Sequence, residues 1–222
     1  MTETLDFSTP AANQLDLCRF APCVGPQYEA GAFDGLRLLV LGESHYRWPG
    51  MPSDERTLTR HVVEAKMKGD PGNFVRGVTS TLLGGPHKGE LERLTLWRNL
   101  AFYNYSQEFA GDHARQRPAH EHWEQAQEPF RQVLDFLSPS VVLVCGKSLW
   151  QHVRKIDGLS DEPLVNPNDE LERSRVARSG ERATVLGMMA HPSSIGFNST
   201  EWAPRIQNYF ARAKSLRLSV TQ

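Results

Sequence analysis

Polar side chains that could do chemistry follow three of the apolar runs in this sequence. Glu43 and Ser44 come after the first run, Asn104 ends the second and His191 follows the last. A carboxylate can stabilise a cation or position water, an imidazole can donate to an anion, and an amide offers both a donor and an acceptor. The alternative is structural: a surface glutamate, a turn asparagine and a histidine that caps a loop. The choice depends on whether the fold brings these residues together.

Four short, nearly continuous apolar runs predict strands that are buried on both faces, as in a parallel sheet. They lie at 36–41, 100–104, 141–145 and 183–189. Helical spacing predicts helices between and after them. Two of these helices cover about 54–68 and 74–83, and a third of about 18 residues ends at the break at Ser138-Pro139. A fourth covers 147–156, and a fifth closes the chain with Thr200 as its N-cap.

The alternation of strands and helices predicts an α/β fold with three αβα layers and a central, mostly parallel four-stranded sheet. We expect a single domain over 1–222, with 1–33 as a peripheral segment and 157–182 mostly as loop. In such a sheet ligands bind beyond the carboxyl ends of the strands. The polar residues named above should therefore gather at one edge.

Composition limits the class of protein. Hydrophobic residues make up 39% of the 222, and no apolar run approaches the roughly 18 residues that span a bilayer. The N-terminus does not resemble a signal peptide, so we expect a cytoplasmic protein without a membrane partner, and a monomer. Three cysteines cannot complete a four-thiolate cluster, and we expect no cofactor and no metal. The formal net charge of -1 neither requires nor excludes a polyanionic partner.

Two loops and one strand together resemble a known family. The loops are Gly42-Glu43-Ser44-His45-Tyr46 and His191-Pro192-Ser193-Ser194, and the segment at 96–105 contains a predicted strand and Asn104. In order and placement they resemble the motifs of the uracil-DNA glycosylase superfamily, over about residues 35 to 215. The resemblance implies the fold of that superfamily and a DNA glycosylase, which hydrolyses the N-glycosidic bond of a flipped-out damaged or modified pyrimidine and leaves an abasic site.

The resemblance also implies a role for each side chain of the motifs. Glu43 would stabilise the cationic sugar or position water, and His191 would hydrogen-bond the departing base. Ile195, aided by Phe197, would fill the gap in the base stack. The base would be contacted by Ser44, His45, Tyr46 and Asn104, and the DNA by Ser193, Ser194, Ile195 and Phe197. No lysine lies in these loops to form a Schiff base, so we expect a monofunctional enzyme.

The departures from the family pattern leave the substrate open. Ser44 stands where the uracil enzymes carry aspartate, and His45 where a proline follows. The base is therefore expected to be uracil-like or a hypermodified cytosine, in DNA repair or in defence against phage. If the loop follows the path that it has in the family, Tyr46 would obstruct a bulky group at position 5 of the base.

Two other functions remain open from the sequence. A non-catalytic module that binds nucleic acid or nucleotides would fit if Glu43 does not replace the aspartate. A Ser-His esterase would use Ser44 as its nucleophile, but Met188 holds the position where such enzymes usually carry the acid. Basic residues that could line a DNA surface or only a solvated face are Lys66, Lys68, Arg76 and Lys88.

Overall fold

A seven-stranded sheet forms the centre of the part of the chain that the structure describes. This computed structural model describes residues 5–86, 89–113, 116–163, 173–180 and 182–218. The strand order is β1-β3-β2-β4-β7-β6-β5. Their bounds are β1 Cys23–Val24, β2 Leu38–Gly42, β3 Leu100–Asn104, β4 Val141–Cys145, β5 Leu159–Pro163, β6 Arg173–Ser179 and β7 Arg182–Met189.

The four predicted strands are confirmed and form the parallel centre of the sheet. β2 pairs with β3 on one side and with β4 on the other, and β4 pairs with β7, all in parallel. Every residue of β2, β3 and β4 is buried. Layers of helices cover both faces of a parallel sheet, which is why these strands read as continuous apolar runs.

The predicted number of strands is wrong, because three antiparallel strands extend the sheet at its edges. β1 pairs with β3, β6 pairs with β7, and β5 pairs with β6. The loop predicted at 157–182 therefore contains a β-hairpin, although 164–172 within it lies outside the described residues. Antiparallel strands can keep one face in water, so β5 at the edge and β6 beside it carry many polar residues and lack an apolar signature.

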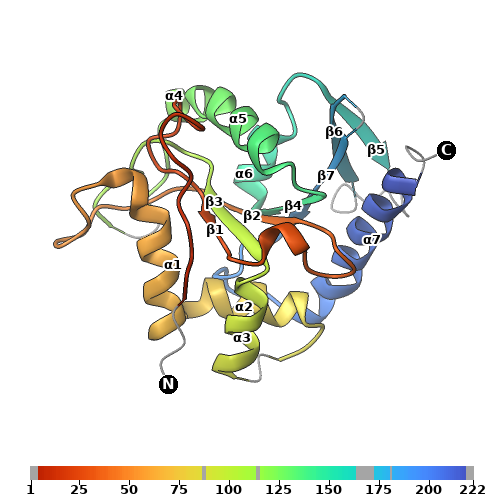
Figure 1. Cartoon of the computed structure of the whole chain (residues 1–222), viewed down its shortest axis with the longest axis horizontal. Helices are drawn as coiled ribbons and strands as arrows, with labels where there is room; N and C mark the ends of the chain where they lie inside the picture. The colour runs from red at the N-terminus through yellow and green to blue at the C-terminus, as the bar shows by residue number, and fades with distance from the viewer. Residues whose placement is uncertain (1–4, 87–88, 114–115, 164–172, 181, 219–222) are drawn as a thin grey trace.

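Helices lie on both sides of the sheet (Figure 1), with α4, α5 and α6 above it and α1, α2, α3 and α7 below it in that view. A short 3-10 turn at Tyr28–Ala30 and another at Glu55–Thr57 precede β2 and α1. The helices are α1 Leu58–Lys68, α2 Gly72–Leu82, α3 Glu90–Trp97, α4 His120–Gln125, α5 Gln127–Leu137, α6 Lys147–Val153 and α7 Ser199–Leu218. This arrangement is compatible with the predicted three layers.

Two details of the predicted helices are wrong. The long helix expected before Ser138 is divided at Ala126 into α4 and α5. Thr200 is not the N-cap of α7, because Asn198 precedes the helix and its Oδ1 accepts from the Thr200 N–H at 3.1 Å. Asparagine and threonine are both good N-caps, and the backbone path decided between them.

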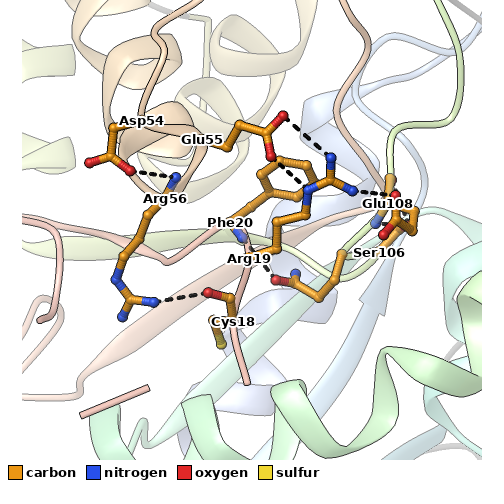
Figure 2. Close-up of polar contacts among 9 residues, drawn as sticks. Cys18, Arg19, Phe20, Asp54, Glu55, Arg56, Ser106 and Glu108 are labelled. Carbon is orange, nitrogen blue, oxygen red and sulfur yellow. Dashed lines mark hydrogen bonds and ion pairs between the residues drawn. The ribbon is translucent and has the colours of Figure 1, made fainter. Parts of the chain in front are cut away.

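The N-terminal segment expected to wrap the outside also contributes to the core. Leu15, Phe20 and Tyr28 are almost fully buried, and β1 lies on the edge of the sheet. Arg56 holds this segment by donating to backbone carbonyls at Leu15 and at Cys18, the second of which is drawn in Figure 2. Among the described residues, no helix is both long enough and apolar enough to cross a membrane.

Candidate functional site

The carboxyl ends of the parallel strands carry the candidate site. The loops after β2 and β3 continue the pairing of those strands, since Tyr105 N donates to Gly42 O at 3.0 Å and Ser106 N to Glu43 O at 2.9 Å. On the other side of β2, Gly146 N after β4 donates to Met189 O at the end of β7, at 2.8 Å. Backbone pairing therefore positions these loops at one edge of the sheet.

Gly42 is required by the close approach of Asn104. A Cβ at Gly42 would lie 2.2 Å from Asn104 Oδ1 and 3.1 Å from Phe102 Cζ. Asn104 is only 6% exposed, and its side-chain amide makes no hydrogen bond to any described residue. A buried amide normally has partners, so this one has a donor and an acceptor available to a ligand.

Glu43 forms an ion pair with a residue that the sequence did not single out. Its Oε2 lies 2.7 Å from Arg117 Nη1, and the Glu43 side chain is 13% exposed while that of Arg117 is 65% exposed. Burial raises the pKa of Glu43 above its ordinary value, and the positive charge of Arg117 opposes the rise. Arg117 lies in a loop without periodic spacing, 74 residues from its partner, so no sequence signal marks it.

His191 is held in one tautomer by its own loop. The Ser193 N–H donates to His191 Nδ1 at 3.2 Å, so the neutral ring carries its proton on Nε2. Burial and then the positive charge of Arg117 lower the pKa of His191. A neutral imidazole with an Nε2–H can donate a hydrogen bond to an oxygen that becomes negative.

Aromatic rings connect His191 with the middle of the sheet. The Phe74 ring from α2 lies 5.4 Å from the His191 ring and 5.6 Å from the Phe102 ring of β3. Phe102 is also the neighbour of Gly42 and hence of Asn104. This series of contacts brings His191 and Asn104 to a shared aromatic surface, which no motif in the sequence predicts.

His45, unlike Asn104, has a hydrogen-bond partner in the core. His45 is buried, with Nε2 3.1 Å from Thr59 Oγ1 and its ring 5.1 Å from Phe20, so it belongs to a small core cluster. Burial lowers the pKa of His45 to about 3. The Ser44 hydroxyl is buried without a hydrogen-bond partner among the described residues, and so no histidine activates it. Tyr46 donates from its hydroxyl to Gln116 O at 3.5 Å.

The loop after His191 exposes one apolar side chain completely. Ile195 is 100% exposed, which is unusual for isoleucine in a short structured loop. Ser194 Oγ donates to His191 O at 2.7 Å, and this bond closes the turn. Phe197 instead packs on α2, where a Cβ at Gly77 would lie 3.0 Å from its ring. The loop is thus anchored at both ends with Ile195 at its tip.

A network of charged residues supports the loop that follows Asn104 (Figure 2). Arg19 donates to Glu55 at 2.7 Å and also pairs with Glu108. The backbone N–H of Phe20 donates to Gln107 Oε1 at 3.0 Å, and Gln107 Nε2 donates to Asn104 O at 3.2 Å. The N-terminal segment thereby fixes the backbone that positions the amide of Asn104.

In the described part of the chain, no group of three or more histidine, cysteine, aspartate and glutamate side chains could hold a metal ion. Of the basic residues noted in the sequence, Arg76 lies on α2 and Lys88 lies outside the described residues. No protein-family model matches this sequence, and a search among curated proteins finds no match. The functional interpretation therefore depends on the site itself.

Proposed function

We propose that this protein is a monofunctional DNA glycosylase that removes a damaged or modified pyrimidine by hydrolysing its N-glycosidic bond. One observation carries the proposal: Glu43 pairs with Arg117, whose charge also lowers the pKa of His191, at the edge of the sheet where the amide of Asn104 has no partner among the described residues. The resemblance of the surrounding motifs to the uracil-DNA glycosylase superfamily supports the same function.

In the proposed reaction the target nucleotide leaves the base stack, which costs about a few kcal/mol. The amide of Asn104 then reads the hydrogen-bonding edge of the pyrimidine, and the rings of Phe74 and Phe102 offer an apolar surface for the base. Ile195, which is fully exposed at the tip of its loop, fills the vacated position in the stack.

Cleavage places positive charge on the sugar and negative charge on the departing base. The carboxylate of Glu43 stabilises the cationic sugar and positions the attacking water. His191 donates from Nε2 to the base oxygen that gains the negative charge, a role that its neutral tautomer fits. The base departs with the electrons of the C–N bond, and the sugar carbon bonds to the water oxygen. Glu43 accepts the proton that the water loses, the base anion takes up a proton on release, and an abasic site remains.

The test uses labelled DNA that contains uracil, hydroxymethylcytosine or glucosylated hydroxymethylcytosine, with alkali to cleave abasic sites. Wild-type protein should give strand cleavage with at least one substrate, and Glu43→Gln and His191→Ala should lose it. Glu121→Gln, an exposed carboxylate on α4, is the matched control and should keep full activity. Equal cleavage by all four proteins, or none by wild type, would contradict the proposal.

The alternative function is a non-catalytic module that binds nucleic acid or nucleotides. The ion pair of Glu43 with Arg117 favours it, because a paired carboxylate is less available to a cationic sugar. Binding of every DNA substrate without cleavage of any would support this alternative. The Ser-His esterase receives no support, because the Ser44 hydroxyl has no hydrogen bond to a histidine among the described residues.

A further inference from the structure

A polar groove lies between α2 and the loop that follows His191. It has a volume of about 330 Å³ and is lined on the loop side by serines and on the α2 side by polar and basic residues. The polar lining residues are Asn73, Arg76, Ser80, Ser193, Ser194 and Ser199. Of the residues on the α2 side, the sequence pointed to Arg76 alone, as a basic residue of either a DNA surface or a solvated face.

Gly77 fixes the shape of this groove. A Cβ at Gly77 would lie 2.7 Å from Pro192 Cβ and 3.0 Å from Phe197 Cε1, so the loop and the helix are in direct contact there. Glycine inside a helix costs about 1 kcal/mol relative to alanine, and here it permits a close approach that alanine would prevent. The two walls of the groove are consequently held at a fixed separation.

The groove carries groups that favour an anion with several oxygen atoms. Ser80 is 8% exposed, and its hydroxyl makes no hydrogen bond to any described residue although it lines the groove. Arg76 is half-exposed and pairs with Asp70 at 3.0 Å, and such an exposed pair exchanges readily. α7 also begins at the groove with Ser199, and the N-terminal end of a helix favours negative charge.

Two carboxylates close in sequence to the starts of α2 and α7 have partners of their own. Asp70 pairs with Arg76, and Glu201 accepts from Asn198 Nδ2 at 3.0 Å. Neither carboxylate lines the groove, so the lining itself is free of negative side chains. A phosphodiester could therefore replace Asp70 as the partner of Arg76 and accept from the Ser80 hydroxyl.

We infer that this groove binds a phosphodiester of a nucleic-acid strand, with Arg76 and Ser80 of α2 as the binding residues opposite the serine loop. The inference rests in part on the proposed function, because the loop that lines the groove also carries Ile195, the residue proposed to fill the base stack. It adds α2 to the nucleic-acid surface. A backbone phosphate held here fixes the strand beside the nucleotide that is displaced into the site.

The first test measures the affinity for fluorescein-labelled, undamaged DNA by anisotropy over a range of salt concentrations. Arg76→Gln should bind about tenfold more weakly at low salt, and its slope of log K against log salt should fall by about 0.9, the loss of one phosphate contact. Ser80→Ala should weaken binding by a smaller factor without changing the slope. Arg131→Gln removes a similarly exposed arginine from α5 and should bind as wild type does.

Inorganic phosphate distinguishes a strand-binding site from a site for free phosphate. A wild-type protein that binds inorganic phosphate through Arg76, while Arg76→Gln keeps full DNA affinity and slope, would overturn the inference. Because the DNA is undamaged, the assay requires no catalysis. Weaker DNA binding by Arg76→Gln would support the phosphodiester site in the groove, even if the protein excises no base. If the wild-type protein excises a base but Arg76→Gln binds DNA as tightly as wild type, the phosphodiester site is wrong and the glycosylase proposal stands.

Discussion

Replacing Arg117 by alanine tests how the charges of the site are coupled. The substitution removes a guanidinium that lies 2.7 Å from Glu43 Oε2 and that also lowers the pKa of His191. Without it, burial alone determines the pKa of Glu43, which must rise, and the pKa of His191 rises because a neighbouring positive charge is gone. The proposed reaction needs Glu43 ionised and His191 neutral. Both groups must therefore be deprotonated for activity. In Arg117→Ala both lose their protons at a higher pH than in the wild-type protein.

The size of the shift follows from the distance and the exposure of the pair. Unit charges about 4 Å apart interact by about 1 kcal/mol in water and about 4 kcal/mol at an effective dielectric constant of about 20. Arg117 is 65% exposed, so solvent screening places the pair near the lower value. We expect the acidic limb of the rate profile to move up by about one pH unit, which corresponds to about 1.4 kcal/mol.

The assay is the pH dependence of kcat/KM for base excision. Arg117→Ala should show the shifted acidic limb and regain activity at higher pH, and Arg117→Lys should resemble wild type. Arg131→Ala, which removes an arginine that pairs with Glu128 on α5, serves as the control. A limb that stays in place or moves to lower pH would refute the assumed coupling. The carboxyl chemical shift of Glu43, followed by NMR over the same pH range, gives an independent reading that does not depend on activity.

Three further predictions concern the loop tip, the glycine beside the amide and the buried histidine. Ile195→Ala should leave the unfolding free energy unchanged within about 0.5 kcal/mol because the side chain is fully exposed, yet lower excision from duplex DNA about tenfold; an equal loss on single strands would argue against a wedge. Gly42→Ala places a methyl group 2.2 Å from Asn104 Oδ1, so KM should rise and stability should fall by about 1–3 kcal/mol; a wild-type KM would show that the amide does not read the base. Burial lowers the pKa of His45 to about 3 from 6.5, so the unfolded chain binds the extra proton as pH falls below 6.5. Chemical denaturation should show about 1.4 kcal/mol of stability lost per pH unit in that window, and His45→Gln should lose this slope; identical slopes in both proteins would contradict it.

The sequence was most informative where burial is complete. The runs that became β2, β3, β4 and β7 are nearly continuous apolar stretches, because helices cover both faces of the strands, and each run could be located from composition alone. β5 at the edge of the sheet and β6 beside it are rich in polar residues, and their antiparallel pairing depends on backbone hydrogen bonds that any sequence can make. Such strands give no periodic signal to read.

The sequence by itself determined that Glu43, Asn104 and His191 follow buried strands, and a general rule of parallel sheets then predicted one shared edge. Only the tertiary structure brought Arg117 to Glu43, exposed Ile195 and placed His45 against Thr59 in the core. The reason is physical: strand positions follow from local burial, whereas the partners of a loop side chain depend on contacts between segments far apart in the chain. No local pattern of residue types encodes those contacts.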